Sequence, residues 1–130
     1  MNAVKVSHFV VSSALLLGCG SDAATPTSSG EVQIVATPKV APRRGANSFT
    51  LTLSKGAIAP GAKQRTSVVV TPWMPSMGHG ASTAPVVTEQ APGTYAVDEG
   101  TFSMAGRWEL RVKVTSDVGD GSATFSYDVP

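Results

Sequence analysis

The chain has 130 residues, of which 10 are lysine or arginine and 9 are aspartate or glutamate, so its formal net charge is +1. This balance supplies no basic patch of the kind that nucleic acid or anionic lipid requires, and we expect no nucleic-acid partner. The single cysteine, Cys19, excludes a disulfide within the chain.

The first 18 residues have the features of an export signal. Lys5 supplies a positive charge near the start, and an apolar stretch follows at 9–17, interrupted only by Ser12 and Ser13. A positive start and a short apolar region are typical of secretory signal peptides, and a helix that spans a bilayer needs about 20 apolar residues. We therefore predict that residues 1–18 are a lipoprotein-type signal peptide that is removed on export.

The end of the apolar stretch resembles the lipobox of bacterial lipoproteins. Its last residues are Leu16-Leu17-Gly18-Cys19, and in such proteins the cysteine is diacylated and becomes the mature N-terminus. The alternative is an ordinary secretory signal with a chance cysteine, but the only cysteine of the chain stands where the lipobox demands it. We therefore expect lipidation of Cys19, and two or more acyl chains anchor a protein stably in a membrane.

The anchor implies a location in the cell envelope. Gly20, rather than aspartate, follows the cysteine, which resembles the default for the outer membrane in Gram-negative lipoproteins. We therefore expect the protein at the outer membrane rather than the inner one, facing the periplasm or the cell exterior.

The mature chain divides into a short tether and one domain. Residues 20–30 are small and polar, with the sequence GSDAATPTSSG, so we assign 19–30 to the lipidated cysteine and a flexible tether. About 100 residues remain, 31–130, which suffice for one hydrophobic core but not for two.

Alternating apolar and polar residues predict β-strands throughout this domain. The clearest runs lie at 49–53, 108–114 and 125–129, and each has one apolar face and one polar face. The continuous run Val68-Val69-Val70 predicts a strand at 66–73 that is covered on both sides or leads into a buried edge. Weaker strands are expected at 31–37, 85–88, 94–98 and 101–104.

Glycine and proline residues separate these strands, and no window has convincing helical spacing. About seven short strands in about 100 residues predict an all-β, immunoglobulin-like sandwich. We expect its core to contain Phe49, Leu51, Val68, Val70, Trp108, Leu110, Val112 and Phe125, and Tyr95 as well.

One segment concentrates soft metal ligands. Met74, Met77 and His79 fall within six positions, and outside the leader the chain has one more methionine, Met104, and no other histidine. Thioether sulfur and imidazole together favour Cu(I) over harder divalent ions. The glycines beside His79 could let these ligands converge, Met104 could complete the site, and Trp73 could cover the ion with its ring face.

The same residues are compatible with other roles. One histidine and no free cysteine fall short of a zinc site, and a blue-copper site needs two histidines and a thiolate. Methionine also fills irregular gaps in cores, so Met74 and Met104 could simply plug one end of the sandwich, with His79 a solvated loop residue. From the chemistry alone, packing and metal binding stay open.

The wider pattern resembles the YtkA-like and FixH-like domains, over about 43–115. In that family a Met-Pro-x-Met-Gly-His motif ends a strand, a Gly-x-Tyr strand follows, and a Met-x-Gly-x-Trp turn leads into a long strand. The matching residues are Met74, Pro75, Met77, Gly78, His79, Gly93, Tyr95, Met104, Gly106 and Trp108, with an upstream Gly-x-Asn at 45–47. The resemblance implies an envelope protein associated with copper handling or cytochrome oxidase assembly. FixH-type proteins usually carry a transmembrane helix, and this chain departs from them in its predicted lipid anchor.

Two functions follow as hypotheses. The first is a membrane-tethered envelope copper-binding protein that holds Cu(I), or delivers it to an envelope partner, through Met74, Met77, His79 and Met104. The alternative is a non-metal interaction module that supports assembly of another envelope protein, with the methionines as an adaptable contact surface. We expect no enzyme, because His79 has no evident acid partner and a Gly-His-Gly loop is poorly preorganised for catalysis.

Overall fold

The computed structural model describes residues 27–54, 66–117 and 119–130, and this part of the chain consists of nine β-strands without a helix. The predicted signal peptide, Cys19 and the tether up to residue 26 lie outside the described residues. No described segment forms a helix of the length and apolarity needed to cross a membrane.

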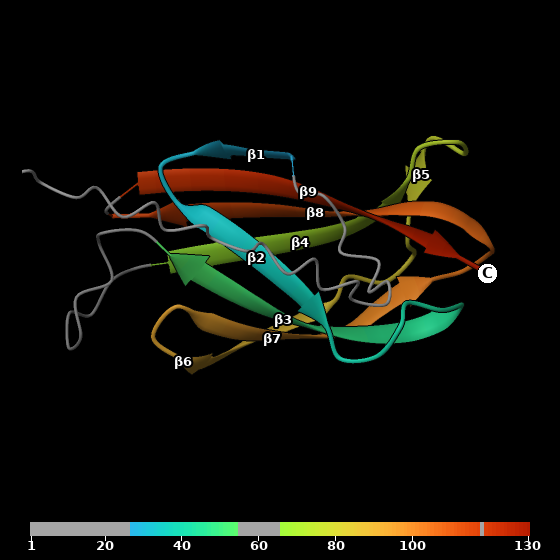
Figure 1. Cartoon of the computed structure of the whole chain (residues 1–130), viewed down its shortest axis with the longest axis horizontal. Coiled ribbons are helices and arrows are strands. Elements are labelled where there is room, and N and C mark those ends of the chain that lie inside the picture. Colours follow the sequence, from blue (N-terminus) through green and yellow to red (C-terminus); the bar gives the residue numbers. More distant parts are fainter. Residues whose placement is uncertain (1–26, 55–65, 118) are drawn as a thin grey trace, which may run out of the picture.

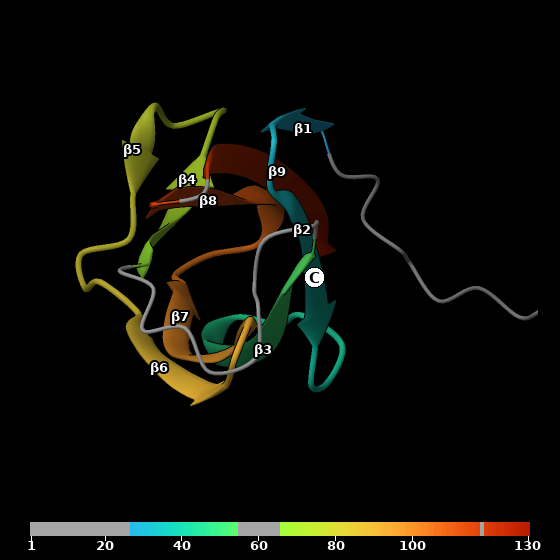
Figure 2. The same ribbon diagram turned by 90° about the vertical axis from the view of Figure 1, so that its left-hand side faces the viewer.

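The strands form two antiparallel sheets that face each other (Figure 1). Sheet A contains, in spatial order, β1 (Thr27–Gly30), β9 (Gly119–Val129), β8 (Gly106–Ser116), β4 (Thr66–Met74) and β5 (His79–Gly80). Sheet B contains β2 (Gln33–Pro38), β3 (Gly45–Ser54), β7 (Thr94–Phe102) and β6 (Val86–Ala91). Seen end-on, the edge strands β1 and β2 lie on one side of the sandwich and β5 and β6 on the other (Figure 2).

This topology confirms the predicted immunoglobulin-like sandwich. The order β2-β3-β7-β6 corresponds to strands A, B, E and D of a constant-type immunoglobulin domain, and β9-β8-β4 corresponds to G, F and C. The structure has nine strands instead of about seven, because β1 and β5 extend the two edges of sheet A.

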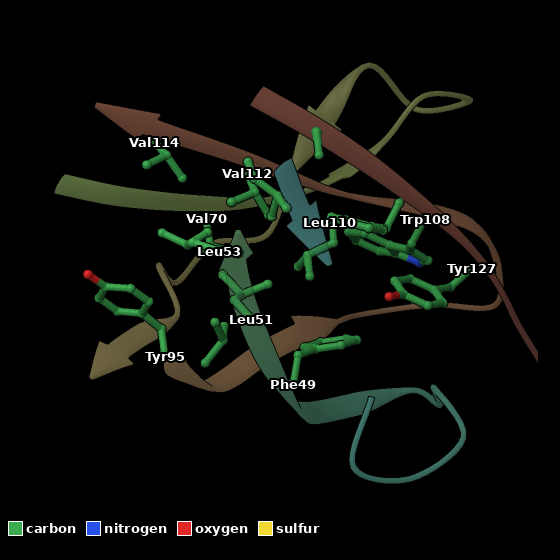
Figure 3. Packing of buried hydrophobic residues seen from close by; sticks show 14 of the residues in the cluster. Phe49, Leu51, Leu53, Val70, Tyr95, Trp108, Leu110, Val112, Val114 and Tyr127 are labelled. Carbon is green, nitrogen blue, oxygen red and sulfur yellow. The ribbon is translucent and has the colours of Figure 1, made fainter. Parts of the chain in front are cut away.

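The core lies between the sheets and is built by the inward residues of the alternating strands (Figure 3). Trp108, Phe49, Phe102 and Leu110 are completely buried. Seven of the eight predicted core residues are buried, and the eighth, Val68, is partly buried and packs against the cluster. Tyr95 is also buried, as predicted.

Strand β4 differs from the prediction in its burial. Val70 is buried but Val69 is exposed, so the strand alternates and is covered on one face only. Of the two alternatives that the sequence left open, coverage on both sides is therefore wrong. Valine has a high preference for strands on either face because its branched side chain fits the pleated surface, so the apolar run did not report burial.

Strand β7 joins two segments that the sequence predicts as separate strands. A β-bulge connects them, because the register with β3 shifts between Asn47 and Phe49. Glu99 lies in this bulge with a φ of 60°, a conformation that side chains other than glycine rarely adopt. The strand ends at Phe102, so Met104 lies in the bend that follows and not on a strand at 101–104.

The ordered sandwich also begins earlier than expected. Thr27–Gly30, predicted as the end of the flexible tether, forms β1 and pairs antiparallel with β9. All four side chains are exposed, so the pairing depends on main-chain hydrogen bonds and gives no apolar signal in the sequence.

Candidate metal centre

A tight hairpin between β4 and β5 carries most of the predicted ligands. Its loop is Pro75-Ser76-Met77-Gly78, and the main-chain nitrogens of Met77 and Gly78 donate hydrogen bonds to the Met74 oxygen at 3.2 and 3.0 Å. Gly78 has a φ of 67°, which glycine adopts without a steric penalty. Four-residue hairpin loops of this kind are commonly built around a type I turn.

The hairpin brings Met74 and His79 together. The two residues are direct partners in the antiparallel pairing of β4 with β5. Such partners place their side chains on the same face of the sheet, with Cβ atoms about 4.5–5.5 Å apart. The exposed fraction of Met74 is only 4%, whereas His79, on the edge strand, is exposed. One buried thioether and one accessible imidazole are therefore neighbours.

Met74 also reaches the bend that contains Met104. A Cβ added to Gly106 would lie 2.6 Å from the Met74 methyl carbon, so that methyl packs directly against the Gly106 backbone. Met104 lies two residues earlier, partly buried against the core. Trp108 Nε1 donates a hydrogen bond to the Met104 oxygen at 2.9 Å, which holds the bend in place.

Met77 lies at the exposed tip of the hairpin. Its exposed fraction is 54%, and its main-chain nitrogen is bound to the Met74 oxygen. The structure thus places one methionine inside the end of the sandwich, one at its surface, and Met104 between these extremes.

Trp73 is not on the face of the sheet that carries Met74. Successive residues of a strand point to opposite faces, and the Trp73 ring packs instead against the Arg111 guanidinium, whose carbon lies 4.8 Å from the ring centroid. Arg111 in turn pairs with Glu109 at 2.7 Å. The ring is already engaged with a cation, so we leave Trp73 out of the candidate ligand set.

The contact that His79 makes indicates which ring nitrogen is available. His79 Nδ1 lies 3.0 Å from the Gly80 carbonyl oxygen. A carbonyl only accepts, so this contact needs the proton on Nδ1 and leaves the lone pair on Nε2. Histidine ligands in metal sites are commonly held by such a hydrogen bond from the second nitrogen.

Harder ligands do not gather anywhere in the described ranges. In 27–54, 66–117 and 119–130, no three His, Cys, Asp or Glu side chains are close enough to hold a metal ion. The candidate centre therefore depends on methionine sulfur. The sequence indicated Gly106 as a turn residue only, and the close approach of Met74 to its backbone is a finding of the structure.

Comparison with known proteins places the chain in a family. The model of the YtkA-like family matches residues 26–113, more than half of the chain. No curated protein and no solved structure matched the chain. The match includes the β4–β5 hairpin and the bend at Met104, so the chain belongs to the YtkA-like family.

Proposed function

We propose that the protein is a membrane-tethered copper-binding protein of the cell envelope that holds Cu(I) or delivers it to an envelope partner. The observation that carries the proposal is the pairing of Met74 with His79, with the Met74 methyl group against Gly106 beside the Met104 bend. Met74, His79 and Met104 form the proposed ligand set, and Met77 at the hairpin tip supplies a further sulfur.

The chemistry of the donors supports Cu(I) as the cargo. Thioether sulfur is soft and uncharged, and imidazole is a good ligand for copper. The low exposure of Met74 keeps water from competing at one donor, while His79 is exposed to solvent. Zinc sites use thiolate, carboxylate or several histidines, which the proposed set does not contain.

The tether and location belong to the same proposal. Cys19 would carry the lipid and hold the domain at the outer membrane, facing the periplasm or exterior. The proposal assigns no catalytic step to any residue.

A competition titration against a Cu(I) chelator tests the copper site. The protein without its lipid, residues 20–130, is compared with Met74→Leu, Met77→Leu and His79→Gln variants. Leucine keeps the apolar volume of methionine and usually costs under about 1.5 kcal/mol in a core, so a folded variant that loses Cu(I) has lost a ligand. Trp73→Phe is the control, because this side chain is directed to the other face of sheet A, and we expect it to compete like the parent.

The alternative remains a non-metal interaction module. The feature that favours it is the 54% exposure of Met77 at the hairpin tip, because exposed methionines make adaptable contact surfaces. If the parent does not compete with the chelator, or all variants compete equally with it, the copper proposal is wrong and the interaction module replaces it.

A further inference from the structure

The connection between β2 and β3, residues 39–44, carries an unusual concentration of cations. Its sequence is KVAPRR, with no acidic residue, and among the connections that the structure describes it is the only one that contains lysine or arginine. The connection 55–65 also contains three cations, but it lies outside the described residues. The side chains of Arg43 and Arg44 are exposed. Val40 has the highest exposed fraction among the large exposed hydrophobic residues of the described ranges, 56%.

This loop is held firmly at both ends. The Lys39 main-chain nitrogen donates to the Ser48 oxygen at 2.9 Å. At the other end, the buried Asn47 side chain accepts from the Arg43 nitrogen at 2.9 Å and donates to the Arg43 oxygen at 2.7 Å. The ends of the loop are therefore fixed in the free protein, so less conformational entropy is lost when the loop binds a partner.

Among the described residues, charges of opposite sign lie at the two ends of the β1/β2 side of the sandwich. Lys39 pairs with Asp98 at 3.5 Å, whereas neither Arg43 nor Arg44 has an ion-pair partner among the described residues. The acidic Glu31 lies against Gly119, where β9 begins. The β1/β2 side of the sandwich thus has exposed arginines at one end and a carboxylate at the other.

The chain enters β1 from its N-terminal side at the same end of the sandwich as the 39–44 loop. β1 runs antiparallel to β9, so its first residue, Thr27, is the one nearer to Val129. The 39–44 loop lies at that end of the sandwich (Figure 1) and on the side opposite β5 and β6 (Figure 2).

We propose that the 39–44 loop is a membrane-contact surface that binds anionic phospholipid headgroups. The proposal rests on the lipid anchor at Cys19. Seven residues, 20–26, separate that cysteine from β1, and the chain from Cys19 to Thr27 reaches at most about 30 Å. The tether therefore keeps the loop at a high local concentration of lipid.

The chemistry of the tip fits this partner. Arginine binds phosphate through two parallel N–H donors, and Val40 contributes apolar surface at the headgroup boundary. Two arginines at an anionic surface favour the orientation in which the loop contacts the membrane over other orientations, by a factor on the order of 30. The β4–β5 hairpin lies at the same end of the sandwich as the loop, but along the opposite side (Figures 1 and 2).

The test uses the processed, lipid-modified full chain in vesicles of phosphatidylcholine, with or without phosphatidylglycerol. Because the thiol of Cys19 is acylated, a cysteine introduced as Val40→Cys or Val86→Cys is the one site for an environment-sensitive fluorophore. Val86 is the matched control, since its exposed fraction of 51% is close to that of Val40 and it lies on β6, at the opposite edge. We expect the label at position 40 to shift to the blue and to become several-fold less accessible to iodide on anionic vesicles only, and the label at 86 to stay unchanged.

Substitution of the arginines makes the test specific. Arg43→Gln with Arg44→Gln should abolish the shift at position 40, whereas Lys113→Gln, an exposed cation on β8, should leave it intact. Equal shifts at 40 and 86, or a shift that survives loss of both arginines, would overturn the proposal. Vesicle flotation separates the two ideas: a chain that does not float refutes the anchor and the loop contact together, and a chain that floats without a shift at 40 refutes the loop contact alone.

Discussion

Trp108 donates a hydrogen bond from its indole Nε1 to the main-chain oxygen of Met104 at 2.9 Å, although its ring is completely buried. The ring also stacks on Phe102, with centroids 5.2 Å apart. The residue that anchors the core therefore also holds the bend that presents Met104. Disturbing this tryptophan should affect both the stability of the fold and the candidate metal centre.

Replacement of Trp108 tests its double role. Trp108→Ala should lower the free energy of unfolding by about 3–5 kcal/mol, the usual range for a buried large aromatic side chain. Trp108→Phe keeps much of the apolar area but leaves the Met104 oxygen without its donor, so its loss should be smaller. Urea unfolding followed by circular dichroism measures both, and a Trp108→Ala midpoint equal to that of the parent would contradict the core assignment.

Tyr127 is the weak point of the core. Its side chain is buried, and within the part of the chain that the structure describes its hydroxyl has no hydrogen-bond partner. A buried hydroxyl without a partner costs about 1–3 kcal/mol. Tyr127→Phe removes the oxygen and keeps the ring beside Phe49, so we expect unchanged or higher stability, by up to that amount, in urea unfolding at neutral pH. A clear loss of stability would indicate that the hydroxyl has a favourable interaction.

The same residue predicts how stability changes at alkaline pH. Burial raises the pKa of Tyr127 to about 12 from 10.0, so the unfolded chain loses this proton first as pH rises. The free energy of unfolding is therefore unaffected by the ionisation of this group below about pH 10. It falls by roughly 2–3 kcal/mol in total between about pH 10 and 12. Unfolding measured at pH 9, 10 and 11 should show a shallower decline for Tyr127→Phe. The stability of Tyr127→Phe should still decline somewhat with pH, because burial and the nearby Glu89 also raise the pKa of Tyr95.

Periodicity alone was sufficient to predict the strands that carry one apolar face. The runs in β3, β8 and β9 bury the alternate residues that the pattern indicates. β1 could not be predicted in this way, because its four side chains are all exposed and only main-chain pairing with β9 orders it. The bulge at Glu99 joins two predicted strands, and such a bulge depends on the register with β3 rather than on local composition.

The candidate centre was predictable in part. The glycines beside His79 suggested that the chain could bend there, and the segment forms a hairpin in which Met74 and His79 are partners. Alternation along β4 places Trp73 on the opposite face from Met74, so strand geometry in the sequence already argued against Trp73 as a cover for the ion. The packing of Met74 on Gly106 joins β4 and β8, which are neighbours in the sheet but far apart in the sequence, so no local pattern could establish it.

Relief of the strained residue in β7 should stabilise the domain. Glu99 has a φ of 60°, and a residue with a Cβ in this region is disfavoured by roughly 1–2 kcal/mol. Glu99→Gly removes that penalty, although the greater freedom of glycine in the unfolded chain offsets part of it. We expect a gain of up to about 1 kcal/mol in thermal unfolding. Glu99→Ala is the control, because it removes the carboxylate but keeps the strain, and an equal gain in both variants would assign the effect to charge.

A methyl group added at Gly106 should disturb the candidate centre without removing a donor atom. Gly106 has a φ of 129°, and a Cβ there would lie 2.6 Å from the Met74 methyl carbon. Gly106→Ala therefore strains the main chain and displaces the Met74 thioether, with an expected loss of about 1–3 kcal/mol. If the copper proposal holds, this variant should also compete less well for Cu(I).

Gly45 offers a matched control for this substitution. It also has a positive φ, 94°, but nothing lies within 4 Å of a Cβ added there. Gly45→Ala thus introduces main-chain strain without touching a side chain, so it should lower stability and leave Cu(I) competition unchanged. Both variants are titrated against the same chelator at a temperature where each is folded. If Gly106→Ala binds Cu(I) as the parent does, while its unfolding confirms the strain, then the position of the Met74 sulfur does not matter for metal binding and Met74 is a packing residue.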